Sequence, residues 1–256
     1  MHVKTLFPSI RFVAMQIMLI FTAVSCASTY ISKPLELEPP PSMSYQTTIP
    51  GTRIVVGVRP YNTPQLIHAQ FQRNGMWRES VIPVKVVIQS IDEHVYRLEG
   101  RSAYIAFGSQ FYPPVSPDEA FDISWQAFRN YIAVKKTLYY TGLVLFTIVT
   151  LGLGSVIWVL PTPFKQPKPD DTPFGRDLTY KSLPKDLTLY KGTLKGGFLY
   201  FRLPKDRLDF KNADLILHLV QKTPVPEEKV VTIPLHPNGK THSNPFLNLL
   251  NGFFTQ

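Results

Sequence analysis

In five short stretches of the chain, every second side chain is apolar. They are residues 54–58, 82–88, 199–203, 215–219 and 231–235. A period of two places the apolar set on one face of a strand, so each stretch predicts a half-buried β-strand. Turn-like residues separate the strands, which favours antiparallel pairing. We therefore predict two small antiparallel β-sandwich-like modules, at residues 51–115 and 178–256.

A helix is predicted between the two modules. Ser116 supplies a cap, Pro117 a first helical residue, and Glu119 a carboxylate three residues after the cap. Apolar residues then recur at helical spacing, namely Phe121, Trp125, Phe128, Ile132 and Tyr139. A stripe of this kind is typical of a helix packed on a core. The predicted fold class is thus mainly β with a central helical segment.

Residues 138–160 carry no charged side chain and are long enough to span a bilayer. In one interpretation Leu138 and Leu160 bound a transmembrane helix, with Trp158 as an interfacial aromatic residue. In the other, Gly142 or the glycines near 152–154 break the helix, which folds back as a hairpin. Lysines flank both sides of the segment, so charge does not distinguish the two interpretations.

The N-terminus has the pattern of an export signal. Lys4 and Arg11 precede an apolar stretch at residues 12–24, which is too short to span a membrane comfortably as a helix. This stretch leads into the sequence Ala23-Val24-Ser25-Cys26.

These four residues resemble the lipobox of bacterial lipoproteins, with Ala23 at the position where leucine is usual. The resemblance implies cleavage between Ser25 and Cys26, a diacylglycerol thioether on Cys26, and acylation of the new amino group. Cys26 is the only cysteine in the sequence, which fits a lipid attachment point and excludes an intramolecular disulfide. The alternative is an ordinary signal peptide or anchor helix with an incidental cysteine.

The residue after the cysteine bears on the destination. In the sorting rule of such lipoproteins, Ala27 in place of aspartate favours the outer membrane, with the protein facing the periplasm. The inner membrane is the alternative.

The predicted organisation has six parts. They are a signal peptide at 1–25, a lipidated cysteine and proline-rich tether at 26–50, the first β module at 51–115, the helices at 116–160, a linker at 161–177 and the second β module at 178–256. The 24 prolines of the chain favour short strands over long helices. Both modules weakly resemble immunoglobulin-like modules, the second those of envelope lipoproteins of unknown function, through the pattern LYKGTLKGGFLYFRLPKD.

The sequence offers little catalytic or metal-binding chemistry. No two of the six histidines stand three or four residues apart, and a single cysteine forms no Cys-x-x-Cys. The Gly-Lys-Thr at 239–241 lacks the earlier glycine of a phosphate-binding loop, because Pro234 stands there. We predict no catalytic residues, metal, cofactor or nucleic-acid partner, since the net charge of +9 is also explained by scattered lysines.

The predicted function is a lipid-anchored cell-envelope protein, a non-catalytic structural or interaction module attached to the membrane through Cys26. Its partner is an unknown envelope protein or lipid. Two alternatives stay open at this point. One is a protein that handles lipid or an anionic glycan, and the other is a single-pass inner-membrane connector.

Overall fold

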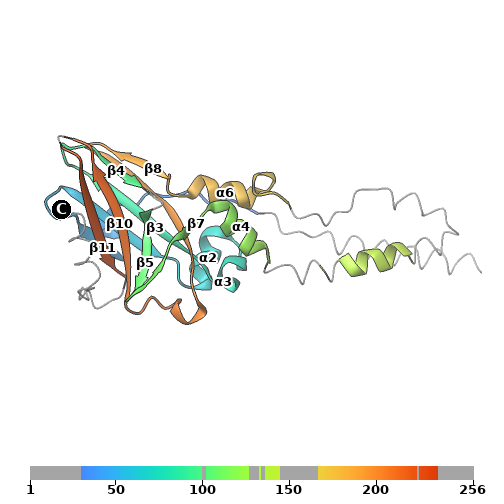
Figure 1. Cartoon of the computed structure of the whole chain (residues 1–256). Helices are drawn as coiled ribbons and strands as arrows, with labels where there is room; N and C mark the ends of the chain where they lie inside the picture. The colour runs from blue at the N-terminus through green and yellow to red at the C-terminus, as the bar shows by residue number, and fades with distance from the viewer. Residues whose placement is uncertain are drawn as a thin grey trace, which may run out of the picture. The chain divides into compact units, whose positions relative to one another are not determined.

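The computed structural model describes residues 30–99, 102–126, 133, 136–144, 167–223 and 225–235. The chain divides into two compact units. One comprises Met1–Ile31 and Arg129–Gln166, and the other, which we call the β unit, comprises Ser32–Phe128 and Pro167–Gln256. The strands described below all belong to the β unit (Figure 1).

The β unit contains two sheets whose strand pairs are all antiparallel. The first has the order β1 (Tyr45–Thr48), β2 (Ile54–Pro60), β3 (Val81–Ser90), β9 (Thr193–Arg202), β7 (Pro114–Val115). The second has the order β6 (Gln110–Tyr112), β5 (Tyr104–Phe107), β10 (Ala213–Gln221), β4 (Tyr96–Glu99), β8 (Asp186–Leu189), with β11 (Glu227–Pro234) on the other edge of β10. Both β5 and β4 pair with β10, one after the other along the same strand.

The predicted fold class is confirmed, because the described chain is mainly β with two antiparallel sheets. The strands of residues 51–115 and those of residues 178–256 do not form separate sheets. The strand β3 pairs with β9 along its whole length, from Val81 opposite Arg202 to Ser90 opposite Thr193. Likewise β4 and β5 pair with β10. Each sheet therefore takes strands from both segments.

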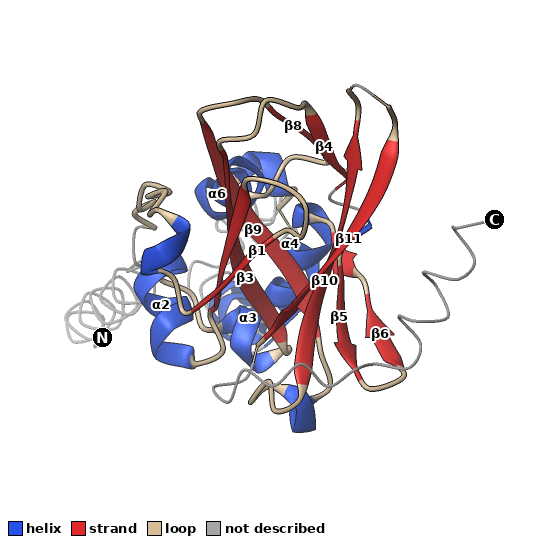
Figure 2. Cartoon of the chain, turned by 90° about the vertical axis from the view of Figure 1, so that its left-hand side faces the viewer, coloured by secondary structure: helices blue, strands red, loops and turns tan. Residues whose placement is uncertain are grey.

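Short helices cover the first sheet on the side away from the second sheet (Figure 2). They are α2 (Pro64–Phe71), α3 (Gly75–Arg78), α4 (Pro117–Gln126) and α6 (Pro173–Lys181). The chain also forms the 3-10 turns η1 (Pro40–Ser42), η4 (Pro169–Asp171) and η5 (Lys205–Arg207). The predicted start of α4 is confirmed, since Ser116 Oγ accepts the Glu119 N–H at 3.1 Å. Being covered on both faces, β3 is buried at nearly every position.

The segment predicted as a linker, 161–177, contains a helix start. Thr172 Oγ1 accepts the Gly175 N–H at 2.9 Å, and Pro173 is the first helical residue. The helix α6 therefore begins inside the predicted linker.

The proline-rich stretch predicted as a tether also packs on the sheet. We call residues 32–43 the strap. Pro40 and Met43 are buried, and β1 follows directly. The strap lies so close to β2 that a Cβ on Gly57 would be 2.7 Å from both Met43 Sδ and Pro40 Cα. The strap can therefore lie this close to β2 only because Gly57 has no side chain.

Candidate functional site

The chain passes between the two units at three points, and on the β unit all three lie at one end, beside α6. The β unit begins at Ser32, its described chain ends at Gln126 in α4, and it resumes at Pro167 before η4. We call Ser32, α4, η4 and α6 together the helical end (Figure 1).

Close packing fixes the helical end. The rings of Phe121 in α4 and Phe174 in α6 lie 5.9 Å apart. A Cβ on Gly175 would be only 2.2 Å from the Pro169 carbonyl oxygen, so only glycine lets η4 lie against α6. The end of α4 and the start of η4 are therefore held close together.

A buried ion pair joins the strap to the helical end. Lys181 Nζ donates to Asp177 Oδ2 at 2.5 Å, one turn apart on α6, and the Ser32 hydroxyl donates to Asp177 Oδ1. Lys181 also lies 3.4 Å from the Gln70 carbonyl oxygen and 5.0 Å from the Phe71 ring centroid in α2. The pair thus connects three parts of the chain: the strap, α2 and α6.

Burial lowers the pKa of the Lys181 ammonium, and the adjacent Asp177 carboxylate opposes that shift without cancelling it. The Lys181 side chain has no exposed area and that of Asp177 has 2%. A lysine sealed in this way lacks access for a substrate, so its chemistry fits a structural role in holding the strap.

A second polar contact fixes the middle of the strap. Glu38 accepts from Arg59 Nη1 and Nη2 at 2.9 and 2.8 Å, and from Lys85 Nζ at 3.2 Å. The hydrogen bonds from Arg59 lower the pKa of the Glu38 carboxyl, and Lys85 adds to this effect against the partial burial. Since the Lys85 side chain is 4% exposed, Glu38 supplies the negative charge that compensates an otherwise buried ammonium.

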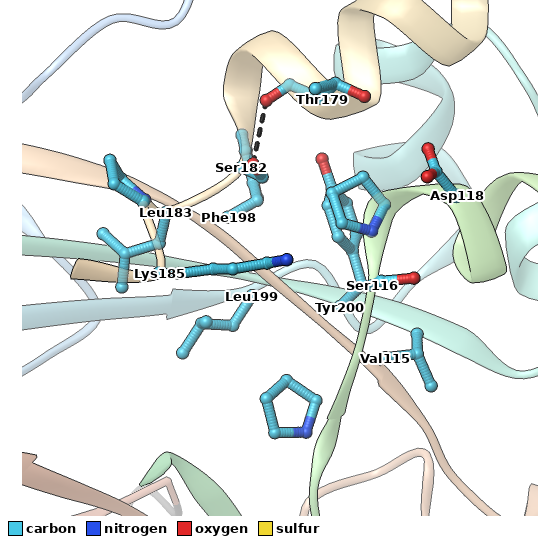
Figure 3. A pocket seen from close by; sticks show the side chains of 13 residues that line it. Val115, Ser116, Asp118, Thr179, Ser182, Leu183, Lys185, Phe198, Leu199 and Tyr200 are labelled. Atoms are coloured by element: carbon cyan, nitrogen blue, oxygen red, sulfur yellow. Dashed lines mark hydrogen bonds between the residues drawn. The ribbon is translucent and has the colours of Figure 1, made fainter. Parts of the chain in front are cut away.

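A hollow of about 550 Å³ lies at the edge of β9, between the start of α4 and the chain that follows α6 (Figure 3). Its apolar lining includes Val115, Leu183, Phe198, Leu199 and Tyr200, and its polar lining includes Ser116, Asp118, Thr179, Ser182 and Lys185. Lys185 extends into the hollow in Figure 3. A volume of this order is in the range of small-ligand sites.

The hydroxyl groups around the hollow serve the local fold. Ser182 donates to the Thr179 carbonyl at 2.8 Å, and Tyr200 donates to the Leu178 carbonyl at 2.9 Å. Ser116 caps α4. The arrangement presents an apolar floor with charged groups of both signs, Lys185 and Asp118, at its sides, which suits binding of a small amphiphile.

At the other end of β9 lie the turns 91–95 and 190–192, which we call the turn end. Asp92 accepts the backbone N–H groups of Arg53 at 2.8 Å and His94 at 3.0 Å, and the Tyr96 hydroxyl at 3.4 Å. Burial acts to raise the pKa of Asp92, but these N–H groups outweigh it and lower the pKa.

Burial, with the nearby Asp92 carboxylate, raises the pKa of Tyr96 to about 12. The Gly192 N–H of the second turn donates to the carbonyl of Ser90, the last residue of β3 before the first turn, at 2.8 Å. Ile91 and Tyr190 are about half exposed here, at 51% and 56%. The turn end is therefore a fixed surface with apolar side chains facing solvent.

The predicted lipidation and membrane residues are mostly outside the described part of the chain. Ser25, Cys26, Trp158 and Leu160 lie outside it. Leu138 is described, in the helical stretch 136–144, with 62% of its surface exposed. Within the described ranges, no helix combines the length and apolarity needed to cross a membrane.

Sequence reasoning missed the Asp177–Lys181 pair and the Glu38 contacts. An acidic and a basic residue four apart normally mark an exposed helix face, and burial depends on α2 and the strap, which are distant in sequence. The start of α6 did have a signal in the sequence, because Thr172-Pro173 repeats the cap pattern of Ser116-Pro117.

The described residues contain no group of three or more His, Cys, Asp or Glu side chains arranged to hold a metal ion. Comparison of the chain with protein-family models, with curated proteins and with solved structures gives no match.

Proposed function

We propose that this protein is a lipid-anchored protein of the bacterial cell envelope, attached through Cys26, whose β unit faces the periplasm as a non-catalytic interaction module. The observation that carries the proposal is the leader followed by Ala23-Val24-Ser25-Cys26, with Cys26 the only cysteine in the sequence. The residue Ala27 supports delivery to the outer membrane.

The strand pairing supports placing the whole β unit on one side of the membrane. In the sequence β3 precedes the apolar residues 138–160 and β9 follows them, yet the two strands pair along their full length. A single crossing by residues 138–160 would put β3 and β9 in different compartments. We therefore do not propose the single-pass connector, and we place both flanks of this segment in the periplasm.

A binding role for the β unit is supported by how its polar groups are used. The buried charges described above are compensated within the fold, by Asp177 for Lys181 and by Glu38 for Lys85. The turn end instead presents Ile91 and Tyr190 to solvent on turns fixed by Asp92. Side chains presented on loops that a rigid scaffold holds in place are common in binding sites.

The proposal is tested by expressing the full chain in a bacterial host with radiolabelled palmitate. We expect label in the wild-type protein and fractionation with the outer membrane. The variant Cys26→Ala should lose the label and leave the outer-membrane fraction, whereas Ser28→Ala, two residues away, should keep both. Wild-type protein without label would contradict lipid anchoring, and label in the inner-membrane fraction would contradict only the destination.

The hollow at β9 favours a second candidate function, the binding of a lipid or an anionic glycan, because it joins an apolar floor to Lys185. Organic extraction of the purified Cys26→Ala protein, followed by mass spectrometry, tests it. We expect a co-purified lipid that is depleted in a Lys185→Glu variant, which changes an exposed residue of the lining. Equal recovery from both variants would contradict binding in this hollow.

A further inference from the structure

We propose that the helical end is the surface of the β unit that faces the membrane, lying against the lipid headgroups, with the turn end directed away. This inference rests on the proposed lipid anchor at Cys26. It adds the orientation of the β unit and names the surface that meets the lipid.

The first argument is the reach of the chain between the lipid and the fold. Only residues 27–31 separate Cys26 from Ser32. Six residue steps span at most about 20 Å when fully extended. The Ser32 hydroxyl is bonded to Asp177, which is itself paired with buried Lys181, so the end of this link is fixed on α6.

The second argument is the length of the sheet. Tyr200 contacts α6 through its hydrogen bond to the Leu178 carbonyl, and Thr193 adjoins the turn end. Seven residue steps of strand separate them, about 23 Å. If the turn end lay on the bilayer, the link from Cys26, which spans at most about 20 Å, would be shorter than the roughly 23 Å between the two ends. With the helical end on the bilayer, the link is slack.

The third argument is independent of Cys26. The chain leaves the β unit after α4 and returns before η4, and the excursion contains the apolar residues 138–160. Both ends of this excursion lie at the helical end, where Phe121 packs on Phe174 and η4 lies against Gly175. Attachment of these apolar residues to lipid would draw the same end toward the membrane.

The chemistry of the surface fits a headgroup layer. Its exposed charged side chains are mainly acidic, namely Asp118, Glu119, Asp122, Asp170 and Asp171, with Arg176 and the adjacent Lys168 as the basic ones. Ethanolamine headgroups carry an ammonium group, which complements these carboxylates, and a phosphate, which complements Lys168 and Arg176. Charged residues of this density are costly to place in hydrocarbon, so we expect contact with headgroups and not insertion.

The test uses the lipidated full chain in vesicles of phosphatidylethanolamine and phosphatidylglycerol that contain a headgroup-linked energy acceptor. Because a lipidated Cys26 has no free thiol, a single introduced cysteine accepts a maleimide donor dye selectively. The two variants are Asp170→Cys at the helical end and Tyr190→Cys at the turn end, both exposed. The parent protein serves as the labelling control.

We expect energy transfer to be several-fold more efficient from position 170 than from position 190. Equal transfer would mean that the β unit lies on its side, and stronger transfer from position 190 would mean the reverse orientation. Either result overturns the inference while leaving the lipid anchor intact. Labelling of the parent would instead show a free Cys26 thiol, which overturns the proposed function and, with it, this orientation.

Discussion

Lys181 Nζ lies 2.5 Å from Asp177 Oδ2, one turn apart on α6, and both side chains are almost completely removed from solvent. The same carboxylate accepts the Ser32 hydroxyl at the start of the strap. An ion pair inside the β unit therefore fixes the point at which the chain from Cys26 joins the fold.

Replacing Lys181 by methionine should destabilise the β unit strongly. The change leaves the Asp177 carboxylate buried without a cation, which typically costs about 3–5 kcal/mol in the free energy of unfolding. Urea unfolding followed by tyrosine and tryptophan fluorescence measures the effect. Lys185→Met, at an exposed lysine four residues on, is the control and should change stability by less than about 0.5 kcal/mol.

The double variant Asp177→Leu with Lys181→Met tests whether the loss comes from the unpaired charge. Replacing both partners by apolar residues of similar volume is often neutral or stabilising. We expect the double variant to recover most of the stability lost in Lys181→Met. A double variant as unstable as the single one would contradict this explanation.

Glu38→Gln should loosen the strap. The change removes the carboxylate that faces buried Lys85, and because Glu38 is itself about one-third exposed we expect a loss of only about 1–3 kcal/mol. Limited proteolysis should cut the strap faster in this variant. Glu36→Gln, on the same strap but exposed and without a described ion pair, should behave as wild type.

The same contact makes a pH prediction. The folded-state pKa of Glu38 is lowered, so its contribution to stability is present above the unfolded value of about 4.5 and is lost as the pH falls through the lower folded value. Stability of the wild type should therefore decline more steeply below about pH 4.5 than that of Glu38→Gln. Parallel curves would contradict the assignment of this carboxylate as the charge partner of Arg59 and Lys85.

Tyr96 should contribute to alkaline unfolding. Its pKa is raised from 10.0 to about 12. The contribution of the protonated hydroxyl to the free energy of unfolding is therefore fully present below pH 10 and is lost as the pH rises from 10 to about 12. Two pKa units correspond to about 3 kcal/mol. Tyr96→Phe should flatten the stability curve in this window, as measured by urea unfolding. Tyr190→Phe, at an exposed tyrosine, is the control and should leave the slope unchanged.

A compartment reporter fused after Gln256 should show periplasmic activity. Residues 167–235 share their sheets with residues 45–115, so both must lie on one side of the membrane, and the proposed export leader would place them in the periplasm. The reporter pair is an enzyme active only outside the cytoplasm and a protein fluorescent only inside it. Cytoplasmic fluorescence would contradict the placement of the β unit in the periplasm.

The local elements were largely predictable from the sequence. Alternation at residues 82–88 predicts β3, that at 199–203 predicts β9, and the Ser116-Pro117 pattern predicts α4, as the structure confirms. A period of two identifies the buried face of a strand but not its neighbour. The pairing of β3 with β9, across more than a hundred residues, was therefore missed, and so was the mixing of the two predicted modules.

The strap shows a further limit of the sequence. The prolines of residues 32–50 favour an extended chain whether or not it packs against something. Its packing depends on the missing side chain of Gly57 and on the charges of Arg59 and Lys85, which belong to other strands. Such contacts become visible only when the sheet is assembled.

The most direct test of the account is the intact mass of the mature protein purified from bacterial membranes, with sequencing of its first peptide. The account predicts a chain that begins at Cys26 and carries a diacylglyceryl thioether and an amide-linked acyl chain. A chain that retains residues 1–25, or one that begins elsewhere with a free Cys26 thiol, would contradict the lipid anchor on which both the proposed function and the orientation of the β unit depend.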